Sequence, residues 1–266
     1  MNALRAGLLL TGVFVAAGLL SLVWTPHDVT QVDIGARLLA PSAAHPFGTD
    51  HLGRDLLSMI QAGAAVSLSV SLLGVGAALL LGVPLGLLAA ARGGWVDEAL
   101  MRTGDLVFAF PWLMLAILLA ATLGPGASNA VLAIAILNIP VFARLTRGEA
   151  RRLWQLDFVA VARLAGKGKA RISAEHILPN LSGPLSVQAT IQFSLALLAE
   201  AGLSYVGLGV QPPAPSWGRM LADAQTLIGT APWLAIAPGL AILLAVFGLT
   251  LIGDGLARHL RRGEGA

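Results

Sequence analysis

Long uncharged stretches dominate the chain, and short polar segments separate them. Each stretch holds at least 22 residues without Asp, Glu, Lys or Arg. An α-helix needs roughly 20 predominantly apolar residues to cross about 30 Å of hydrocarbon. We therefore expect each stretch to contain at least one membrane-spanning helix. The stretches are residues 6–27, 56–91, 106–143, 176–199 and 224–253.

The stretches divide into six expected spans. Gly124-Pro125-Gly126 predicts a tight turn that splits the third stretch into two spans. Polar residues precede the second stretch and predict a short helix from Asp50 to Ile60 ahead of the span proper. Within that span, Gly82 and Gly86 are spaced for close packing against another helix. The prediction is an all-α membrane protein with spans at about residues 6–24, 64–91, 98–123, 127–143, 184–205 and 233–256.

The few charged residues predict the orientation of these spans. Only 12% of the residues are charged, about half the share in a typical soluble domain, which excludes a soluble enzyme. If the N-terminus is cytoplasmic, 14 of the 17 basic residues fall in cytoplasmic segments. Cytoplasmic loops of membrane proteins are rich in Lys and Arg. We therefore expect both termini in the cytoplasm and read the basic pI as a topology signal rather than a sign of nucleic-acid binding.

We expect three parts along the chain. Residues 1–63 would form the first span and an outer segment, residues 64–260 a core of five spans, and residues 261–266 a cytoplasmic tail. The core includes a large basic cytoplasmic loop, 144–183, between the fourth and fifth spans. In this loop an amphipathic helix precedes Gly166-Lys167-Gly168, and a second helical stretch is expected to end at Pro179. The pattern alone fits either docking to a partner protein or contact with lipid head groups.

Catalytic and metal-binding motifs are missing from the sequence. The chain has no cysteine, no Gly-x-x-x-x-Gly-Lys-Ser/Thr loop, no Gly-x-Ser-x-Gly elbow and no His-Glu-x-x-His. The five histidines are scattered along the sequence. We expect no enzyme activity of its own, no metal site and no cofactor in this chain.

Polar residues in the fifth span are candidates for a transport path. Gln188, Gln192 and Glu200 recur at helical spacing in an otherwise apolar segment. Such a stripe fits a water-lined path for a polar substrate. It fits equally well with hydrogen bonding or ion pairing to neighbouring helices.

Four segments, in order, resemble a known family of transporters. They are His45-Pro46-Phe47-Gly48-Thr49-Asp50-His51-Leu52-Gly53-Arg54-Asp55, Met101-Arg102-Thr103-Gly104-Asp105 with Pro111, Phe158-Val159-Ala160-Val161-Ala162-Arg163-Leu164-Ala165-Gly166 with Ile177-Leu178-Pro179-Asn180, and Gln211-Pro212-Pro213-Ala214-Pro215-Ser216-Trp217-Gly218. The third resembles the cytoplasmic EAA loop of ABC-transporter importer permeases. The others resemble the dipeptide/oligopeptide/nickel branch of that family, C-type subunit.

The resemblance implies partners and site residues. It implies a heterodimer with a second six-span permease, two cytoplasmic ATPase subunits that bind ATP and Mg²⁺, and an outer substrate-binding protein, in the bacterial inner membrane. The EAA loop would be the coupling helix that docks into an ATPase. The implied coupling residues are Ala162, Arg163, Ala165, Gly166, Lys167 and Gly168. The implied docking residues for the binding protein are Asp50, Arg54, Asp55 and Trp217.

Three readings of the function remain open at this point. The first is a permease for peptides or nickel, since the motifs are shared by both. The second is a permease of the same kind for another small solute such as a metal chelate. The third is a stand-alone secondary transporter, which would need buried charges for ion coupling and usually an internal repeat.

Overall fold

The computed structural model describes residues 2–263, and these form a bundle of helices without a β-strand. The helices are α1 (Asn2–Ser21), α2 (Leu56–Arg92), α3 (Gly94–Ala109), α4 (Trp112–Leu123), α5 (Ala127–Leu153), α6 (Asp157–Leu164), α7 (Lys169–Ile172), α8 (Leu178–Tyr205), α9 (Trp217–Ala224) and α10 (Trp233–Gly263), with a 3-10 turn η1 (Ile34–Ala36) and a π-helical segment η2 (Ser173–Ile177). Residues 264–266 of the expected cytoplasmic tail lie outside the described residues.

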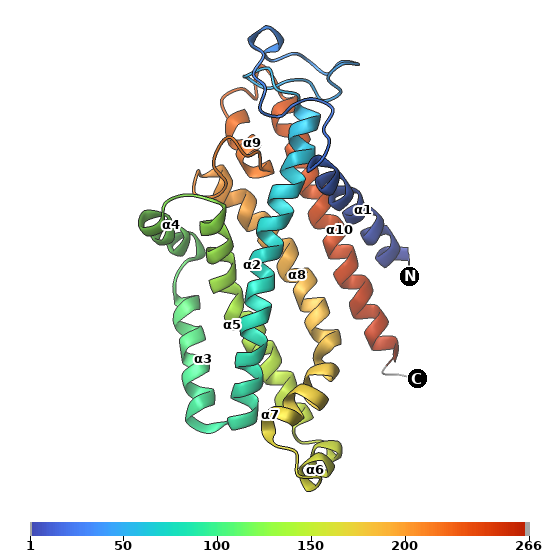
Figure 1. The fold of residues 1–266 in the computed structure, drawn as a ribbon, viewed down its shortest axis with the longest axis vertical. Coiled ribbons are helices and arrows are strands. Elements are labelled where there is room, and N and C mark those ends of the chain that lie inside the picture. Colours follow the sequence, from blue (N-terminus) through green and yellow to red (C-terminus); the bar gives the residue numbers. More distant parts are fainter. Residues whose placement is uncertain (1, 264–266) are drawn as a thin grey trace.

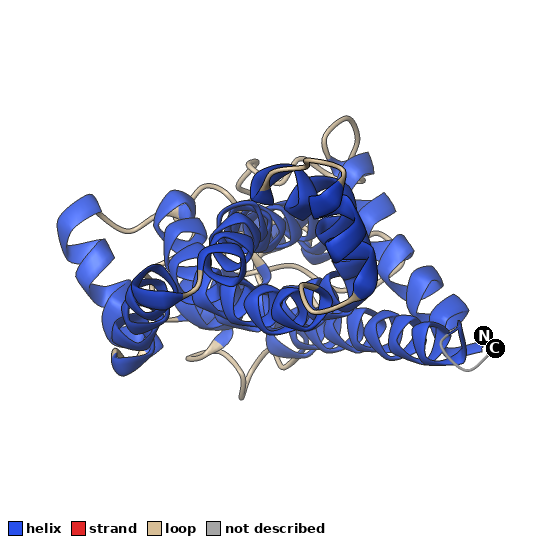
Figure 2. Ribbon diagram, turned by 90° about the horizontal axis from the view of Figure 1, so that it is seen from below, coloured by secondary structure: helices blue, strands red, loops and turns tan. Residues whose placement is uncertain are grey.

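The long helices alternate in direction (Figure 1). α1 runs toward the end of the molecule that carries α9, and α2 runs back toward the end that carries α6. α3, α5, α8 and α10 continue the alternation. Seen from below, the start of α1 and the end of α10 lie together at one edge of the bundle (Figure 2). This arrangement agrees with an even number of passes.

Four helices are long and apolar enough to cross a membrane, and two bent pairs raise the number to six. The four are α1, α2, α5 and α10. α3 and α4 form one bent pair, and the segments 169–180 and 182–205 form the other. The all-helical membrane fold is confirmed at this coarser level of four to six spans.

α2 and α5 pack closely because two glycines face α5. A Cβ atom added to Gly82 would lie 2.6 Å from the carbonyl oxygen of Ile139, and one added to Gly86 would lie 2.5 Å from that of Ala143. Any side chain at either position would push the two helices apart. The predicted close-packing role of Gly82 and Gly86 is confirmed.

The beginning of α2 differs from the prediction. No separate helix runs from Asp50 to Ile60; α2 begins at Leu56 and continues unbroken to Arg92. The Asp55 carboxylate caps it by accepting a hydrogen bond from the backbone N–H of Ser58 at 2.8 Å. A helix of 37 residues is about 55 Å long, so α2 extends well beyond the hydrocarbon thickness of a membrane.

The third expected span is not straight. α3 and α4 meet at an angle of 87°. Phe110 lies between them in an extended conformation because it precedes Pro111, and a residue before proline avoids the helical region. The span expected over residues 98–123 therefore consists of two helices with a sharp bend between them.

The loop expected over residues 144–183 is helical over most of its length. α5 does not end near Ala143 but continues to Leu153. Pro179 does not end the second helical stretch either, because α7, η2 and α8 follow one another without a gap and Pro179 lies near the start of α8. η2 directly precedes α8, and the chain bends by 67° between the segments 169–180 and 182–205.

Candidate functional site

The turn after α6 is a glycine-terminated helix end. Gly166 has a positive φ of 75°, a conformation that glycine adopts without strain. The N–H of Lys167 donates to the carbonyl of Ala162 at 3.1 Å, and the N–H of Gly166 donates to that of Arg163 at 2.9 Å. This pair of bonds is the Schellman motif, which closes the helix end and turns the chain sharply. The predicted coupling residues therefore form one rigid corner.

The charged side chains of this corner are paired within the chain. Lys167 contacts Glu175 at 2.7 Å, and Arg171 reaches the other oxygen of the same carboxylate at 2.5 Å. Hydrogen bonds from Lys167 first and Arg171 second lower the pKa of Glu175 to about 2. The Arg163 guanidinium lies 5.2 Å over the ring of Trp154. The first two pairings hold the corner against α7 and η2, and the third holds it against the end of α5.

The two faces of α6 differ sharply. Val159 and Ala162 are buried against the core of the chain. On the opposite face, Val161 is 65% exposed and Leu164 is 90% exposed. Ala162 therefore packs inward rather than forming the surface, while an apolar tip projects from the end of the molecule (Figure 1). An exposed apolar tip on a rigid corner is typical of a surface that a partner covers.

Gln192 lies in a groove between α4, α5 and α8. Its side-chain amide donates to the Asn138 side chain at 2.5 Å. The groove has a volume of ≈ 340 Å³, and Trp112 and Leu137 also line it. Gln188 is half-buried one turn away on α8. Sequence reasoning overlooked Asn138, although an amide in an uncharged span is the signal that identified Gln192.

Glu200 lies apart from this groove. It is fully buried, it does not line the groove, and it accepts a hydrogen bond from the Ser204 hydroxyl at 2.7 Å. The hydroxyls of Ser67 on α2 and Ser216 before α9 lie next to the same carboxyl. Glu200 thus lies where α2, α8 and the start of α9 meet, and its neighbours indicate that it links these three helices.

Trp217 fixes α9 inside the bundle. It is fully buried, and its indole N–H donates to the carbonyl of Ile60 at 3.0 Å. Its ring packs edge-on against Phe14 of α1 at 5.4 Å between centroids. The next residue, Gly218, approaches α8 so closely that an added Cβ would lie 2.2 Å from the carbonyl oxygen of Ala201. Trp217 supports the outer loops from beneath rather than forming their surface.

The loop before α2 is organised by Asp50. One carboxylate oxygen accepts the backbone N–H groups of Leu52 and Arg54, each at 2.8 Å. The other oxygen binds the Arg54 guanidinium at 2.7 Å. Asp50 is only 4% exposed. Asp50 and Arg54 therefore hold the loop in shape.

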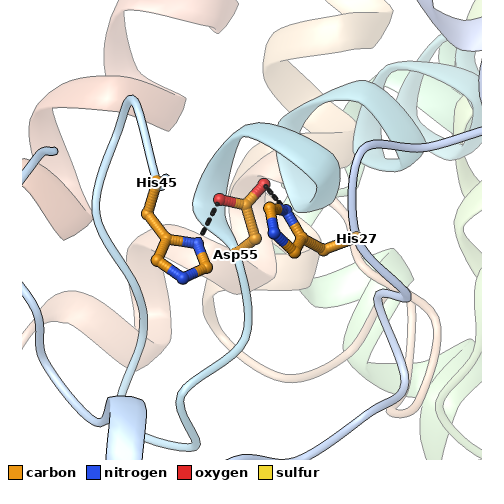
Figure 3. Close-up of side chains that lie close together, drawn as sticks. All are labelled: His27, His45 and Asp55. Carbon is orange, nitrogen blue, oxygen red and sulfur yellow. Dashed lines mark hydrogen bonds and ion pairs between the residues drawn. The ribbon is translucent and has the colours of Figure 1, made fainter. Parts of the chain in front are cut away.

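Asp55 gathers two histidines from distant parts of the sequence (Figure 3). His45 Nδ1 lies 2.9 Å from one carboxylate oxygen, and His27 Nδ1 lies 3.7 Å from the other. Burial opposes ionisation of Asp55, but hydrogen bonds from Ser58 and His45 and the charge of His27 outweigh it and hold its pKa below the ordinary value. The structure brings together histidines that look scattered along the sequence.

Comparison with known proteins assigns the chain to a family. The family described as "Binding-protein-dependent transport system inner membrane component" matches residues 82–264. The chain belongs to this family. It is the permease subunit of an ABC importer and a protein of the inner membrane, and the stand-alone transporter reading is thereby replaced.

Several relatives of the permease carry substrate names. A dipeptide transport system permease of Alkalihalophilus pseudofirmus is 42% identical over 94% of this chain and 82% of its own length. A di/tripeptide permease of Pseudomonas aeruginosa is 43% identical over 94% of this chain and 84% of its own. A nickel permease of Escherichia coli is 37% identical over 96% of this chain and 92% of its own.

A solved structure shares the fold of the permease. It is an inward-facing form of the MetNI methionine ABC transporter, which matches with a TM-score of 0.62 at 17% identity. The match covers 76% of this chain and 95% of the other chain. At this identity the likeness concerns the fold alone.

Proposed function

We propose that the permease crosses the membrane six times, with both termini and the α6 corner in the cytoplasm. Two observations support this topology. The long helices alternate in direction, and 14 of the 17 basic residues fall in the segments that this topology places in the cytoplasm. α3 with α4, and the bent helix that ends in α8, each count as one crossing. The outer loops and α9 then face the opposite side.

The permease works as half of a translocation unit. Its partners are a second six-span permease, two cytoplasmic ATPase subunits that hold ATP and Mg²⁺, and an outer substrate-binding protein. Family membership supports this assembly, and the lack of a nucleotide-binding loop in the sequence supports a separate motor subunit. The chain itself contributes no catalytic residue.

The α6 corner is the contact with the motor. Leu164 and Val161 enter a cleft of one ATPase subunit, and the Schellman turn at Gly166 passes the motion of that subunit to α5 and α8. The 90% exposed Leu164 is the observation that carries this assignment. ATP-driven closure of the two motors biases a two-state equilibrium between inward-open and outward-open forms.

The path follows the groove that holds the amides of α5 and α8. Gln192 and Asn138, with Gln188 one turn away, offer donors and acceptors to a polar solute between otherwise apolar walls. Glu200 acts beside the path by fixing α9. At the outer end, Asp50, Arg54, Asp55 and Trp217 hold the surface on which the binding protein docks.

The substrate we propose is a di- or oligopeptide. The names of the relatives at 42% and 43% identity support peptides, and neutral amide groups such as those of Gln192 and Asn138 suit a peptide backbone. The nickel permease at 37% identity makes nickel the second candidate. Uptake of a labelled dipeptide and of Ni²⁺ by the assembled transporter with its binding protein separates the two.

The coupling assignment is tested by Leu164→Asp. We expect dipeptide uptake to fall at least tenfold, because a carboxylate replaces an apolar group in the docking cleft, while insertion into the membrane is retained. Trp95→Gln is the matched control, since Trp95 is 79% exposed in the first turn of α3 and is not part of the corner. Normal uptake by Leu164→Asp at normal abundance would contradict the assignment.

A further inference from the structure

Three side chains of the outer segment converge on one small space. The nitrogen atoms of His27 and His45 and a carboxylate oxygen of Asp55 all lie within 4.8 Å of one another. Both imidazole rings present Nδ1 to the carboxylate (Figure 3). The rings lie beside each other, with their centroids 4.7 Å apart. The three residues come from the segment after α1, the outer loop and the start of α2.

The surrounding structure holds each of these groups in place. The second oxygen of Asp55 accepts hydrogen bonds from the N–H and the hydroxyl of Ser58, at 2.8 and 2.7 Å. The same Ser58 hydroxyl accepts the backbone N–H of His27 at 3.0 Å. The N–H of His45 donates to the Ser42 hydroxyl at 3.2 Å. A carboxylate fixed by partners that are not themselves ligands is characteristic of preorganised metal sites.

The spacing of the three groups fits a metal ion. Tetrahedral ligands bound at about 2.0 to 2.1 Å lie about 3.3 Å from one another. His45 Nδ1 lies 2.9 Å from one oxygen of the Asp55 carboxylate, and His27 Nδ1 lies 3.7 Å from the other. One ligand atom from each residue lies within 4.8 Å of the other two, so small side-chain movements bring the three to this spacing. A hydrogen bond accounts for His45 but not for His27, because 3.7 Å is too long for one. An ion between the groups engages both imidazoles at once.

We propose that His27, His45 and Asp55 bind a divalent transition-metal ion on the outer face of the permease. Two imidazole nitrogens and one carboxylate oxygen suit Zn²⁺, Ni²⁺ or Cu²⁺ rather than Mg²⁺ or Ca²⁺, which take oxygen ligands. The His27 side chain is 44% exposed, so solvent reaches the ion and supplies a further ligand. The bound ion joins the segment after α1, the loop that carries His45 and the start of α2, and it stiffens the surface beneath the binding protein. The proposal does not depend on which solute the permease transports.

The test measures Zn²⁺ binding to the assembled, chelator-stripped transporter in lipid nanodiscs by competition with a zinc indicator. The wild type is expected to bind one Zn²⁺ more per permease than His27→Gln/His45→Gln. His51→Gln is the matched control, because His51 lies in the same outer loop but outside the cluster. It should bind as the wild type does. Co²⁺ in place of Zn²⁺ should give visible absorption bands that the double variant lacks.

Two results would overturn the proposal. Equal Zn²⁺ binding by the wild type and the double variant would show that the cluster is only a hydrogen-bonded contact. The same conclusion would follow if His51→Gln lost as much Zn²⁺ binding as the double variant. Asp55 is left intact because it also caps α2. If the double variant does not assemble, His27→Gln alone serves, since its side chain is exposed; its Zn²⁺ affinity should fall at least about tenfold.

Discussion

The two ends of the permease are built in opposite ways. At the outer end, the functional candidates Asp50, Asp55 and Trp217 are all buried, and hydrogen bonds within the chain occupy their polar atoms. At the inner end, Leu164 is 90% exposed on a corner whose charges are already paired. The candidate residues of the outer end therefore serve the fold, whereas the candidate residue of the inner end, Leu164, is left exposed by the rest of the chain.

The difference indicates what each end needs from its partner. A docking surface for a binding protein that comes and goes must keep its shape when bare, so its framework lies beneath the surface. In the proposed assembly, a contact with a permanently attached ATPase subunit can leave an apolar group exposed in the isolated chain, because that subunit would cover it. We therefore expect outer-end substitutions to act on stability and inner-end substitutions to act on coupling.

The largest expected effect on stability comes from Trp217→Ala. The variant loses a fully buried indole and its hydrogen bond to Ile60, which should cost about 3 to 5 kcal/mol. The measurement is the thermal unfolding midpoint of the purified permease in detergent. Trp95→Ala is the control, since 79% of that side chain is exposed, and it should change the midpoint little. Equal decreases of the unfolding midpoint in the two variants would contradict the conclusion that buried residues of the outer end hold the fold together.

A smaller stability effect with a large functional effect is expected from Gly166→Val. A branched side chain at a φ of 75° should cost about 1 to 2 kcal/mol and distort the corner without any steric clash, since no atom lies within 4 Å of the added Cβ. ATPase activity stimulated by the loaded binding protein should fall severalfold while the complex still inserts.

Gly148→Ala is the matched control for this variant. Gly148 lies within α5, and an added Cβ there also meets no atom within 4 Å, but its φ is not positive. Its stimulated ATPase activity should remain near the wild-type level. If both variants lose activity alike, the left-handed turn at Gly166 is not what couples the motor to the spans.

The smallest effect is expected from the ion pairs that hold the corner. The pKa of Glu175 is lowered from 4.5 to about 2, so its ionised form stabilises the folded state above about pH 4.5, and this contribution is lost as the pH falls toward 2. Thermal midpoints of the wild type and Glu175→Gln should differ by a constant amount from pH 7 to 5 and converge below pH 4.5. A difference that stays unchanged from pH 5 down to pH 2 would show that charge is not the cause.

The sequence predicts the spans well because their signal is local. A run of 20 or more uncharged residues identifies a membrane helix without knowledge of its neighbours, and Gly82 and Gly86 show their packing role by spacing alone. The bend at Pro111 and the extension of α5 to Leu153 were missed because uncharged runs measure hydrophobicity and not helix direction or length. The position of Pro179 in a first turn depends on where the helix starts, which the run does not reveal.

The candidate sites depend on long-range contacts that no local pattern contains. Gln192 and Asn138 are 54 residues apart, and His27 lies 28 residues before Asp55. Glu200 shares a helical stripe with Gln192 in sequence, yet it faces Ser204 and the neighbourhood of α9 instead of the groove. Spacing places residues on a helix face approximately, whereas the neighbouring helices decide which of those residues meet.

Photocrosslinking at the exposed corner of α6 tests most directly whether this corner contacts an ATPase subunit. Benzoylphenylalanine replaces Leu164 in the assembled transporter, and the same replacement at Val23, which is 85% exposed at the opposite end, is the control. We predict that irradiation joins position 164 to an ATPase subunit and that position 23 gives no such product. Absence of an ATPase adduct at position 164, or an ATPase adduct at position 23, would contradict the assignment of α6 as the contact with the motor.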